Sequence, residues 1–217
     1  PTSAMDTCLC MGGSISMAHG FEMATESSDH VAVLGDSTFF HSGITGLINM
    51  NYNGAKGTVI ILDNRITGMT GHQQNPGTGY TLMGKEAPEV DIPALCKAMG
   101  VKDENIITVN PNHLDEVNEA LDKLLPKDEP TVLITRWPCV LKKFSQQDID
   151  EFPTLHKTQC VIDQDKCKNC KMCMKLGCPA ISEKDGNVVI DETQCNGCGL
   201  CMNVCPFGAI EMEEGGK

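Results

Sequence analysis

The sequence predicts an α/β domain built on a parallel sheet, followed by a small cysteine-rich α+β domain. Short apolar runs alternate with segments of helical period between residues 14 and 135. Regular alternation of strand and helix is typical of a parallel sheet with helices on both faces. Two closely spaced cysteine runs occupy the C-terminal part of the chain and indicate a second domain.

Each element follows from its local pattern. Apolar residues recur at spacings of three and four in the helical segments, and the strands are short apolar runs. Ser42 is expected to be the N-cap of the second helix. The expected elements, in order, are a helix over 14–27, a strand over 31–34, a helix over 42–53, a strand over 58–62, a helix near 91–99, a strand near 106–109, a helix over 112–125 and a strand over 131–135.

The 217 residues divide into three parts. Residues 1–135 form the larger domain, and the hydrophobic content of 41% is enough to bury its core. Residues 136–158 lose the alternating pattern and are expected to be a linker, while residues 159–217 form the small domain. The chain begins at Pro1 without an initiator methionine, so we expect it to be the C-terminal piece of a longer protein.

The net charge of −12 argues against nucleic acid or an anionic membrane as a partner. No apolar run approaches the ~20 residues that cross a bilayer, and no charged-then-apolar leader opens the sequence. Cysteine is abundant, with 13 residues and no secretory signal, which indicates metal chemistry in a reducing compartment. We therefore expect a cytoplasmic protein from an anaerobic or low-oxygen setting.

The cysteine runs have the spacing of iron–sulfur ligands. A C-x2-C-x2-C run supplies three corners of a 4Fe-4S cube, and a cysteine distant in the sequence supplies the fourth. This chain has two such runs, each followed by a Cys-Pro pair. In two-cluster ferredoxins that last cysteine crosses to the other cube. The expected ligands are Cys167, Cys170, Cys173 and Cys205 for one cluster, and Cys195, Cys198, Cys201 and Cys178 for the other.

A zinc ribbon and a disulfide framework are the alternatives. Zinc ribbons use two C-x2-C pairs, whereas three evenly spaced cysteines and a Cys-Pro do not divide in that way. A reducing compartment disfavours disulfides. Val-Ile-Asp precedes both runs, at residues 161–163 and 189–191, and this offset of 28 indicates a duplicated half-site unit. One departure from the pattern is that four residues, not three, precede Cys178 in the first run.

Polar residues at two strand ends predict a site in the larger domain. Ligands of open parallel sheets bind beyond the carboxyl ends of the strands. Residues 35–38 (Gly-Asp-Ser-Thr) and 63–66 (Asp-Asn-Arg-Ile) follow the first two strands. Magnesium prefers oxygen ligands and is usually bound by one or two carboxylates together with phosphate oxygens. We therefore expect Asp36, Asn64 and a backbone carbonyl near Ile66 to bind it. Capping or surface solvation would also explain these residues.

The pair Gly35-Asp36, followed after 27 residues by Asn64, resembles the thiamine diphosphate motif that binds magnesium and the diphosphate. Together with the two cysteine runs, three further segments are similar to the large subunit of the indolepyruvate:ferredoxin oxidoreductase family: residues 10–15, 35–43 and 62–73. The resemblance implies a thiamine diphosphate-binding fold for the larger domain. It also implies a bacterial-type two-cluster ferredoxin fold for the small one.

What the resemblance implies for function is oxidative decarboxylation of an aryl 2-oxoacid, with coenzyme A and a ferredoxin acceptor. The products would be an acyl-CoA, carbon dioxide and reduced ferredoxin, and two one-electron clusters match the two electrons released. The implied cofactors are thiamine diphosphate, Mg²⁺ and two 4Fe-4S clusters. Family members place thiamine between two domains, so we expect a preceding segment or a partner subunit to supply the pyrimidine half, in a hetero-oligomer.

Individual residues also receive expected roles. Gly35, Ser37 and Thr38 are expected at the diphosphate, with capping as the alternative for the two hydroxyls. Cys10, Met69 and Thr70 are expected at the cofactor by resemblance, and core packing is the alternative for Met69. His41 and His72 are expected to line the active-site pocket and handle protons or the substrate carboxylate, although a lone histidine is more often a packed or hydrogen-bonded structural residue.

Arg65 is expected either to reach a carboxylate or diphosphate or to be a solvated loop residue. Cys8 and Cys10 have a C-x-C spacing, which differs from the C-x2-C spacing found near a third cluster in related enzymes. We therefore expect the cysteines outside the two runs to be ordinary buried thiols, with Cys10 at the cofactor.

Other functions remain open. Another 2-oxoacid, such as pyruvate, a branched-chain oxoacid or 2-oxoglutarate, would use the same cofactors. A non-catalytic electron-transfer module would use the cysteines and leave Asp36 and Asn64 without thiamine diphosphate. A non-redox thiamine decarboxylase would leave the cysteine runs without a purpose.

Overall fold

The structure is a computed structural model that describes residues 5–27, 29–152 and 159–213. It divides into two compact units, Pro1–Lys142 (unit 1) and Lys143–Lys217 (unit 2). Among the helices in the described ranges, none has the length and apolar character to cross a membrane.

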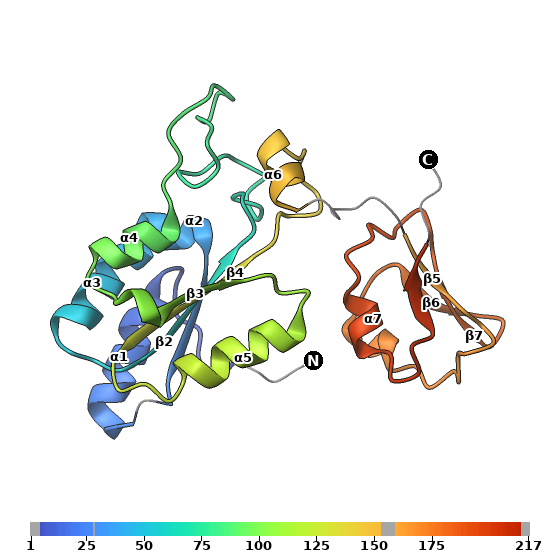
Figure 1. Ribbon diagram of the computed structural model, residues 1–217, viewed down its shortest axis with the longest axis horizontal. Helices are drawn as coiled ribbons and strands as arrows, with labels where there is room; N and C mark the ends of the chain where they lie inside the picture. Colours follow the sequence, from blue (N-terminus) through green and yellow to red (C-terminus); the bar gives the residue numbers. More distant parts are fainter. Residues whose placement is uncertain (1–4, 28, 153–158, 214–217) are drawn as a thin grey trace. The chain divides into compact units, whose positions relative to one another are not determined.

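Unit 1 is built on a four-stranded parallel sheet with the strand order β1-β2-β4-β3 (Figure 1). Parallel neighbours need crossover connections, which helices supply here. The parallel arrangement predicted from the alternating pattern is therefore confirmed. The strands are β1 (Val31–Gly35), β2 (Gly57–Asp63), β3 (Ile106–Val109) and β4 (Pro130–Arg136).

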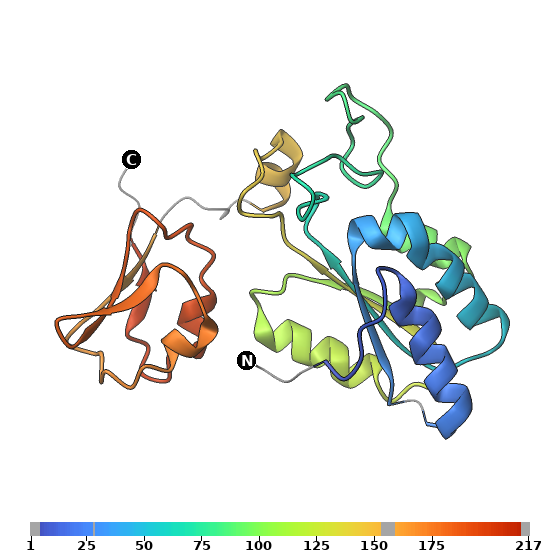
Figure 2. The ribbon, with the colours of Figure 1, turned by 180° about the vertical axis from the view of Figure 1, so that it is seen from behind.

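Helices lie on both faces of this sheet (Figure 1 and Figure 2). One face carries the larger core, in which Ile15 and Leu47 from helices pack with Ile61 from β2. On the other face, Leu124 packs against Leu133 of β4. The helices of unit 1 are α1 (Gly13–Thr25), α2 (Asp36–Thr38), η1 (Phe39–Gly43), α3 (Ile44–Tyr52), α4 (Ile92–Ala98), η2 (Asp103–Asn105) and α5 (Leu114–Leu124).

The face covered by α5 is only partly protected. The strand register aligns Val33, Ile60, Leu133 and Ile107 in one row across this face. Leu133 is 1% exposed beneath α5, whereas Val33 at the β1 edge is 49% exposed. Among the described residues, the β1 side of this face is therefore an apolar surface without a covering helix.

The second helical segment begins earlier than the sequence predicts. α2, η1 and α3 follow one another without a gap from Asp36 to Tyr52, and η1 is a π-helical turn. Ser42 is not an N-cap, because its Oγ donates to the Thr38 carbonyl at 3.3 Å inside the helix. A serine hydroxyl can bond the carbonyl four residues before it, so serine alone does not define a helix start. The helix N-terminus lies directly after β1.

The carboxyl ends of the strands are tied together after β4. Trp137 N–H donates to the Asp63 carbonyl at 3.0 Å, and Cys139 N–H donates to the Asn64 carbonyl at 2.9 Å. The start of the expected linker thus continues the edge of the sheet. Figure 1 shows α2 and the long connection between β2 and α4 at this same end.

The segment 136–158, expected to be a linker, also contains a helix. α6 (Gln146–Glu151) begins at a capping box in which Asp148 N–H donates to Ser145 Oγ at 3.1 Å. A helix of 6 residues is too short to produce a helical period in the sequence. The end of the segment, 153–158, lies outside the described residues.

Unit 2 contains two antiparallel strand pairs, β5 with β8 and β6 with β7. Short helices connect them, in agreement with the expected α+β class. Its further elements are β5 (Cys160–Ile162), η3 (Cys173–Leu176), β6 (Ile181–Lys184), β7 (Asn187–Ile190), α7 (Leu200–Val204) and β8 (Ile210–Met212).

The duplication read from the sequence is also present in the hydrogen bonds of unit 2. Cys167 N–H donates to the Asp163 carbonyl, and Cys195 N–H donates to the Asp191 carbonyl, each at 2.9 Å. Both aspartates stand at the same place in the repeat, directly after a strand. Each cysteine run is therefore introduced by the same backbone turn.

Candidate functional site

The carboxylate of Asp36 lies at the helix N-terminus that follows β1. The residue is only 3% exposed. Asn75 Nδ2 donates to Asp36 Oδ2 at 3.0 Å, and the backbone N–H groups of Ser37 and Ile66 also donate to this carboxylate. Buried charges need partners, and the donors named here are all neutral groups.

Burial, and then the negative charge of Asp63, raise the pKa of Asp36 from 3.8 to about 6, against the lowering effect of its hydrogen bonds. A cation beside this pair of carboxylates would favour their charged forms and so offset both causes of the shift. Oxygen donors are the ligands that Mg²⁺ prefers. The residues present therefore fit a magnesium ion.

The three expected magnesium ligands come together in the structure. Ile66 N–H donates to Asn64 Oδ1 at 3.2 Å and to the Asp36 carboxylate. The two side chains thus converge on the backbone of Ile66, which is 3% exposed. Metal binding by these three residues stays a prediction.

A buried ion pair beside the site was not predicted. Arg136 Nε donates to Asp63 Oδ2 at 2.6 Å, and the two side chains are 15% and 5% exposed. The register pairs these residues at the adjacent ends of β4 and β2. Arg65 N–H donates to the second oxygen of Asp63 at 3.1 Å, so the pair also holds the loop that carries Asn64. Opposite charges at two strand ends were the available signal.

Sequence reasoning also missed Asn75. This residue is 7% exposed and lies in the irregular connection between β2 and α4. Its Oδ1 accepts a hydrogen bond from Gly77 N–H at 2.9 Å, which leaves Nδ2 free to reach Asp36. The only local signal was the turn pattern Asn-Pro-Gly, which indicates a turn but not its partner.

Ser37 and Thr38 occupy the first turn of the helical segment. Gly35 precedes it in an extended conformation and makes no side-chain cap. Thr67 Oγ1 donates to Ser37 Oγ at 2.8 Å, and Thr38 is 7% exposed. The helix dipole at this N-terminus favours an anion such as a diphosphate.

A groove beside β1 brings together other residues expected at the cofactor. Cys10, Gly35 and Thr38 all line it. The N-terminal segment approaches the helix closely at Gly12, where a Cβ atom would lie 1.9 Å from Ser42 Oγ. The φ of Gly12 is 82°, so glycine suits both the backbone and the contact.

Met69 and Thr70 lie in a loop that is closed by a bridge between Thr67 and Gln73. Met69 is 90% exposed, which excludes the alternative that it packs in the core. Thr70 Oγ1 donates to Gln73 Oε1 at 2.5 Å and so stiffens the loop. A contact of these residues with a cofactor stays a prediction.

The two histidines expected in the pocket are both exposed. His41 Nδ1 lies 2.9 Å from Ser42 Oγ. His72 has a left-handed backbone, with φ of 65°, and its Nε2 lies 3.8 Å from Cys139 Sγ. These contacts assign no catalytic role, and such roles stay predictions.

Of the two alternatives for Arg65, the structure shows the one in which the side chain reaches a carboxylate, because Arg65 is 3% exposed and its Nη1 lies 3.6 Å from Glu89 Oε1. Cys8 and Cys10 are not buried thiols, because both are exposed on the N-terminal segment. Loop position alone did not reveal that Glu89, 24 residues away along the chain, provides a partner for Arg65.

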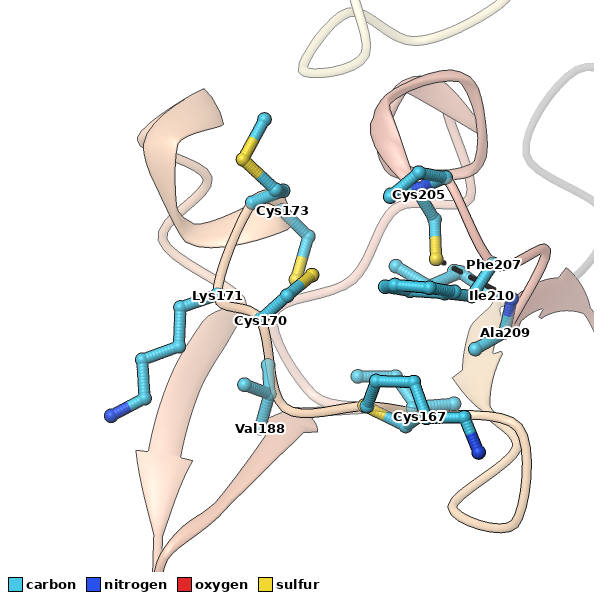
Figure 3. Close-up of a pocket in the computed structure, with 13 residues that line it drawn as sticks. Cys167, Cys170, Lys171, Cys173, Val188, Cys205, Phe207, Ala209 and Ile210 are labelled. Atoms are coloured by element: carbon cyan, nitrogen blue, oxygen red, sulfur yellow. Dashed lines mark hydrogen bonds between the residues drawn. The ribbon is translucent and has the colours of Figure 1, made fainter.

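In unit 2 the cysteines form two groups, each with members from both runs. The first cysteine set, defined as Cys167, Cys170, Cys173 and Cys205, lines one pocket. Figure 3 shows these four side chains around a common space, with Val188 and Ile210 against it. Ala209 N–H donates to Cys205 Sγ at 3.4 Å, as expected of a sulfur held for a cluster.

The second cysteine set consists of Cys178, Cys195, Cys198 and Cys201. Burial, and then the charges of the neighbouring sulfurs of Cys160, Cys178 and Cys195, raise the pKa of the Cys198 thiol, against the lowering effect of a hydrogen bond from Leu200 N–H. Cys178 therefore lies beside the second run, although it follows the first in the sequence. This is the exchange of fourth cysteines that the two-cluster pattern predicts.

The extra residue before Cys178 has a local explanation. The first run continues into the 3-10 helix η3, which ends at Gly177 with φ of 72°. The second run continues into the α-helix α7. The two runs thus reach their fourth cysteines by different turns.

No group of three or more His, Cys, Asp or Glu side chains in the described ranges is arranged to hold a single metal ion. Cluster ligands sit at separate corners of a cube and need not converge on one point. Cluster binding by the two cysteine sets stays a prediction.

Comparison with known families decides the class of the larger unit. The family model described as thiamine pyrophosphate enzyme, C-terminal TPP binding domain, matches residues 1–135. The chain belongs to the thiamine pyrophosphate enzymes. A second model, 4Fe-4S binding domain, matches residues 188–211 of this thiamine pyrophosphate enzyme.

Curated relatives of this thiamine pyrophosphate enzyme carry the name indolepyruvate oxidoreductase subunit IorA. The protein from Methanothermobacter marburgensis is 42% identical over 98% of the chain, and the one from Pyrococcus horikoshii is 35% identical over 100%. The chain covers 33% and 35% of these two relatives, so it spans about a third of their length. The family resemblance read from the motifs is confirmed.

Among solved structures, a 2-oxoglutarate:ferredoxin oxidoreductase from Magnetococcus marinus is similar with a TM-score of 0.56 and 16% identity. The match covers 65% of this chain and 51% of that one. At this identity the likeness supports the fold. The α/β thiamine fold with a C-terminal iron–sulfur domain is therefore as expected.

Proposed function

We propose that this chain is part of an indolepyruvate:ferredoxin oxidoreductase. The reaction consumes an aryl 2-oxoacid, coenzyme A and two oxidised ferredoxins, and gives an acyl-CoA, carbon dioxide, two reduced ferredoxins and a proton. The observation that carries this proposal is that one chain has both a candidate thiamine diphosphate site and two candidate iron–sulfur sites. The buried Asp36 with Asn64 and the two cysteine sets lie within one alignment that covers 98% of the chain.

Residues of unit 1 would hold the cofactor. Asp36, Asn64 and the Ile66 carbonyl provide oxygen ligands for Mg²⁺, and the helix N-terminus at Ser37 and Thr38 provides N–H donors for the diphosphate. Thiamine diphosphate, when bound, supplies an electron sink that allows carbon dioxide to leave the 2-oxoacid. The ion pair of Arg136 with Asp63 keeps the magnesium loop in place.

Residues of unit 2 would carry the electrons away. Decarboxylation and acyl transfer release two electrons, whereas a ferredoxin accepts one at a time. Two 4Fe-4S clusters, one on each cysteine set, can hold both electrons until the acceptor arrives. Each set has cysteines from both runs, and cysteines of both sets belong to one small hydrophobic core. The two clusters would therefore lie on either side of a shared core.

A partner subunit or a further domain would complete the thiamine site. The relatives are named as subunits, and the face of the sheet beside β1 exposes Val31 and Val33. An exposed apolar face of this kind is a common feature of interaction sites. We propose a cytoplasmic hetero-oligomer in which the partner supplies the pyrimidine half.

The test is an anaerobic assay of the complete complex with oxidised ferredoxin and coenzyme A. Indolepyruvate and phenylpyruvate should give higher kcat/KM than pyruvate, a branched-chain oxoacid or 2-oxoglutarate. Preference for one of the last three would replace the aryl substrate. Failure to bind thiamine diphosphate in the presence of Mg²⁺ would instead favour an electron-transfer module without catalysis.

A further inference from the structure

The internal repeat places different residues at equivalent points beside the two cysteine sets. An offset of 28 relates Val161 to Val189 and Cys167 to Cys195, and the same offset relates Cys160 to Val188. Cys160 begins β5, and Val188 lies in β7. At this position one half of the repeat therefore has the thiol of Cys160, and the other half has the isopropyl group of Val188.

Val188 is a packing residue of the first cysteine set. It is 1% exposed and lines the pocket formed by that set. Figure 3 shows its side chain against the space between Cys167 and Cys170. An isopropyl group fills space there and can donate no hydrogen bond.

Cys160 occupies the equivalent place at the second cysteine set. It is 2% exposed and belongs to the same apolar core as Cys201. Its backbone N–H donates to Cys195 Sγ at 3.4 Å, which places the residue directly beside a ligand expected for the second cluster. The second set thus has a fifth sulfur beside the four that are expected to bind iron.

The Cys160 thiol has one proton to donate. In the structure it lies 3.5 Å from Met212 Sδ, a weak thioether acceptor. A thiolate ligand on a negatively charged cluster is a stronger acceptor, because hydrogen bonds to charged acceptors are roughly twice as strong as neutral ones. With a cluster present, the thiol proton would therefore be expected to turn toward a ligand sulfur.

We propose that the Cys160 thiol is a positioning residue that donates a hydrogen bond to a ligand sulfur of the second cluster and raises the reduction potential of that cluster above the potential of the first. The proposal rests on the two-cluster assignment above. Reduction adds negative charge to the cluster, and a donor to its sulfurs stabilises the added charge. Val188 gives the first cluster no such donor, so the duplicated unit provides two unequal electron sites.

The test is a redox titration of the complete, anaerobically purified complex, followed by electron paramagnetic resonance. Cys160→Val copies the residue of the other half-site and removes only the thiol, because the backbone N–H to Cys195 remains. One midpoint potential should become more negative while the other stays in place. Cys160→Ser keeps a donor and should retain most of the original potential. Cys96→Val, at a buried thiol of unit 1, is the matched control and should move neither.

The outcomes separate this role from others. Equal shifts in Cys160→Val and Cys160→Ser, or no shift in either, would refute hydrogen bonding by the thiol. Loss of about half of the iron in Cys160→Val would make Cys160 a ligand and refute the positioning role. The unsubstituted complex should contain about eight iron atoms per chain. A value near zero would overturn the cluster assignment itself, and with it this proposal.

Discussion

Asn75 donates a hydrogen bond from Nδ2 to Oδ2 of Asp36, at 3.0 Å, across 39 residues of sequence. Both residues are buried, so the bond fixes the direction of the carboxylate before any cation is bound. A loop residue thereby orients a group at the end of a strand.

Asp36→Asn should stabilise the cofactor-free chain at neutral pH. Asp36 has a pKa of about 6 in the folded protein and 3.8 as a free side chain. Below the lower value the acid is neutral in both states, and the cost of burying its charge grows as the pH rises to about 6. The cost above that pH is about 3 kcal/mol. Denaturation midpoints at pH 4 and pH 7 measure it.

The stabilisation should appear at pH 7 and vanish near pH 4, because Asn cannot ionise. The same variant should lose Mg²⁺-dependent retention of thiamine diphosphate. A variant that is less stable than the unsubstituted chain at both pH values would contradict the assigned burial cost. Retained cofactor would contradict the magnesium site.

Asn75→Ala should weaken the same site from the other side. The substitution removes the only side-chain donor named for Asp36 and leaves a buried carboxylate oxygen without it, which costs about 1–3 kcal/mol. Binding of Mg²⁺ and thiamine diphosphate, measured by calorimetry, should become weaker but not vanish. Asn49→Ala, at an exposed amide, is the control and should leave binding unchanged. Unchanged binding in Asn75→Ala would remove it from the site.

Arg136→Ala should lower the free energy of unfolding of unit 1 by about 3 kcal/mol, because it leaves the buried Asp63 carboxylate without its cation. Lys56→Ala removes an ion pair of similar length, 2.9 Å, between side chains that are 41% and 80% exposed. Exposed pairs contribute little, so that control should melt with the unsubstituted chain. Equal melting temperatures for all three proteins would show that the Arg136 pair has no structural role.

Gly12→Ala and Gly20→Ala should change stability in opposite directions. A Cβ on Gly12 would clash with Ser42 Oγ and would require a left-handed alanine, which costs about 1–2 kcal/mol before the clash is counted. Gly20 lies within α1, and no atom lies within 4 Å of the position that a Cβ would take. Gly20→Ala should therefore raise the free energy of unfolding by about 0.5–1 kcal/mol. Denaturant titration of both variants measures the two changes, and a tolerated Gly12→Ala would refute the close approach.

Cys198→Ser should remove one cluster from the complete complex. Iron should fall from about eight to about four atoms per chain, and ferredoxin reduction should stop. Thiamine diphosphate binding should persist, because the residues proposed to bind it lie in unit 1. Bound zinc in place of iron in the unsubstituted protein would contradict the cluster assignment, as would unchanged iron in the variant.

Local pattern predicted most elements of the sheet but not where the decisive helix begins. The strands around Val33 and Ile60 could be located because apolar runs ending in glycine or aspartate are local signals. The helix start at Asp36 was missed because a serine can hydrogen-bond the backbone both at an N-cap and inside a helix. Ser42 does so inside the helix, where its Oγ donates to the Thr38 carbonyl. The position of a site residue relative to the helix N-terminus therefore required the structure.

What the sequence determined by itself was the alternation that gives a parallel sheet, the two strand ends that carry Asp36 and Asn64, and the cysteine spacing of unit 2. These depend on residues close together along the chain, where periodicity and ligand spacing are direct physical constraints. Tertiary structure alone decided the rest. Asn75, Arg136 and Cys160 acquire their roles from strand order and loop packing, which bring residues far apart in sequence within hydrogen-bond distance.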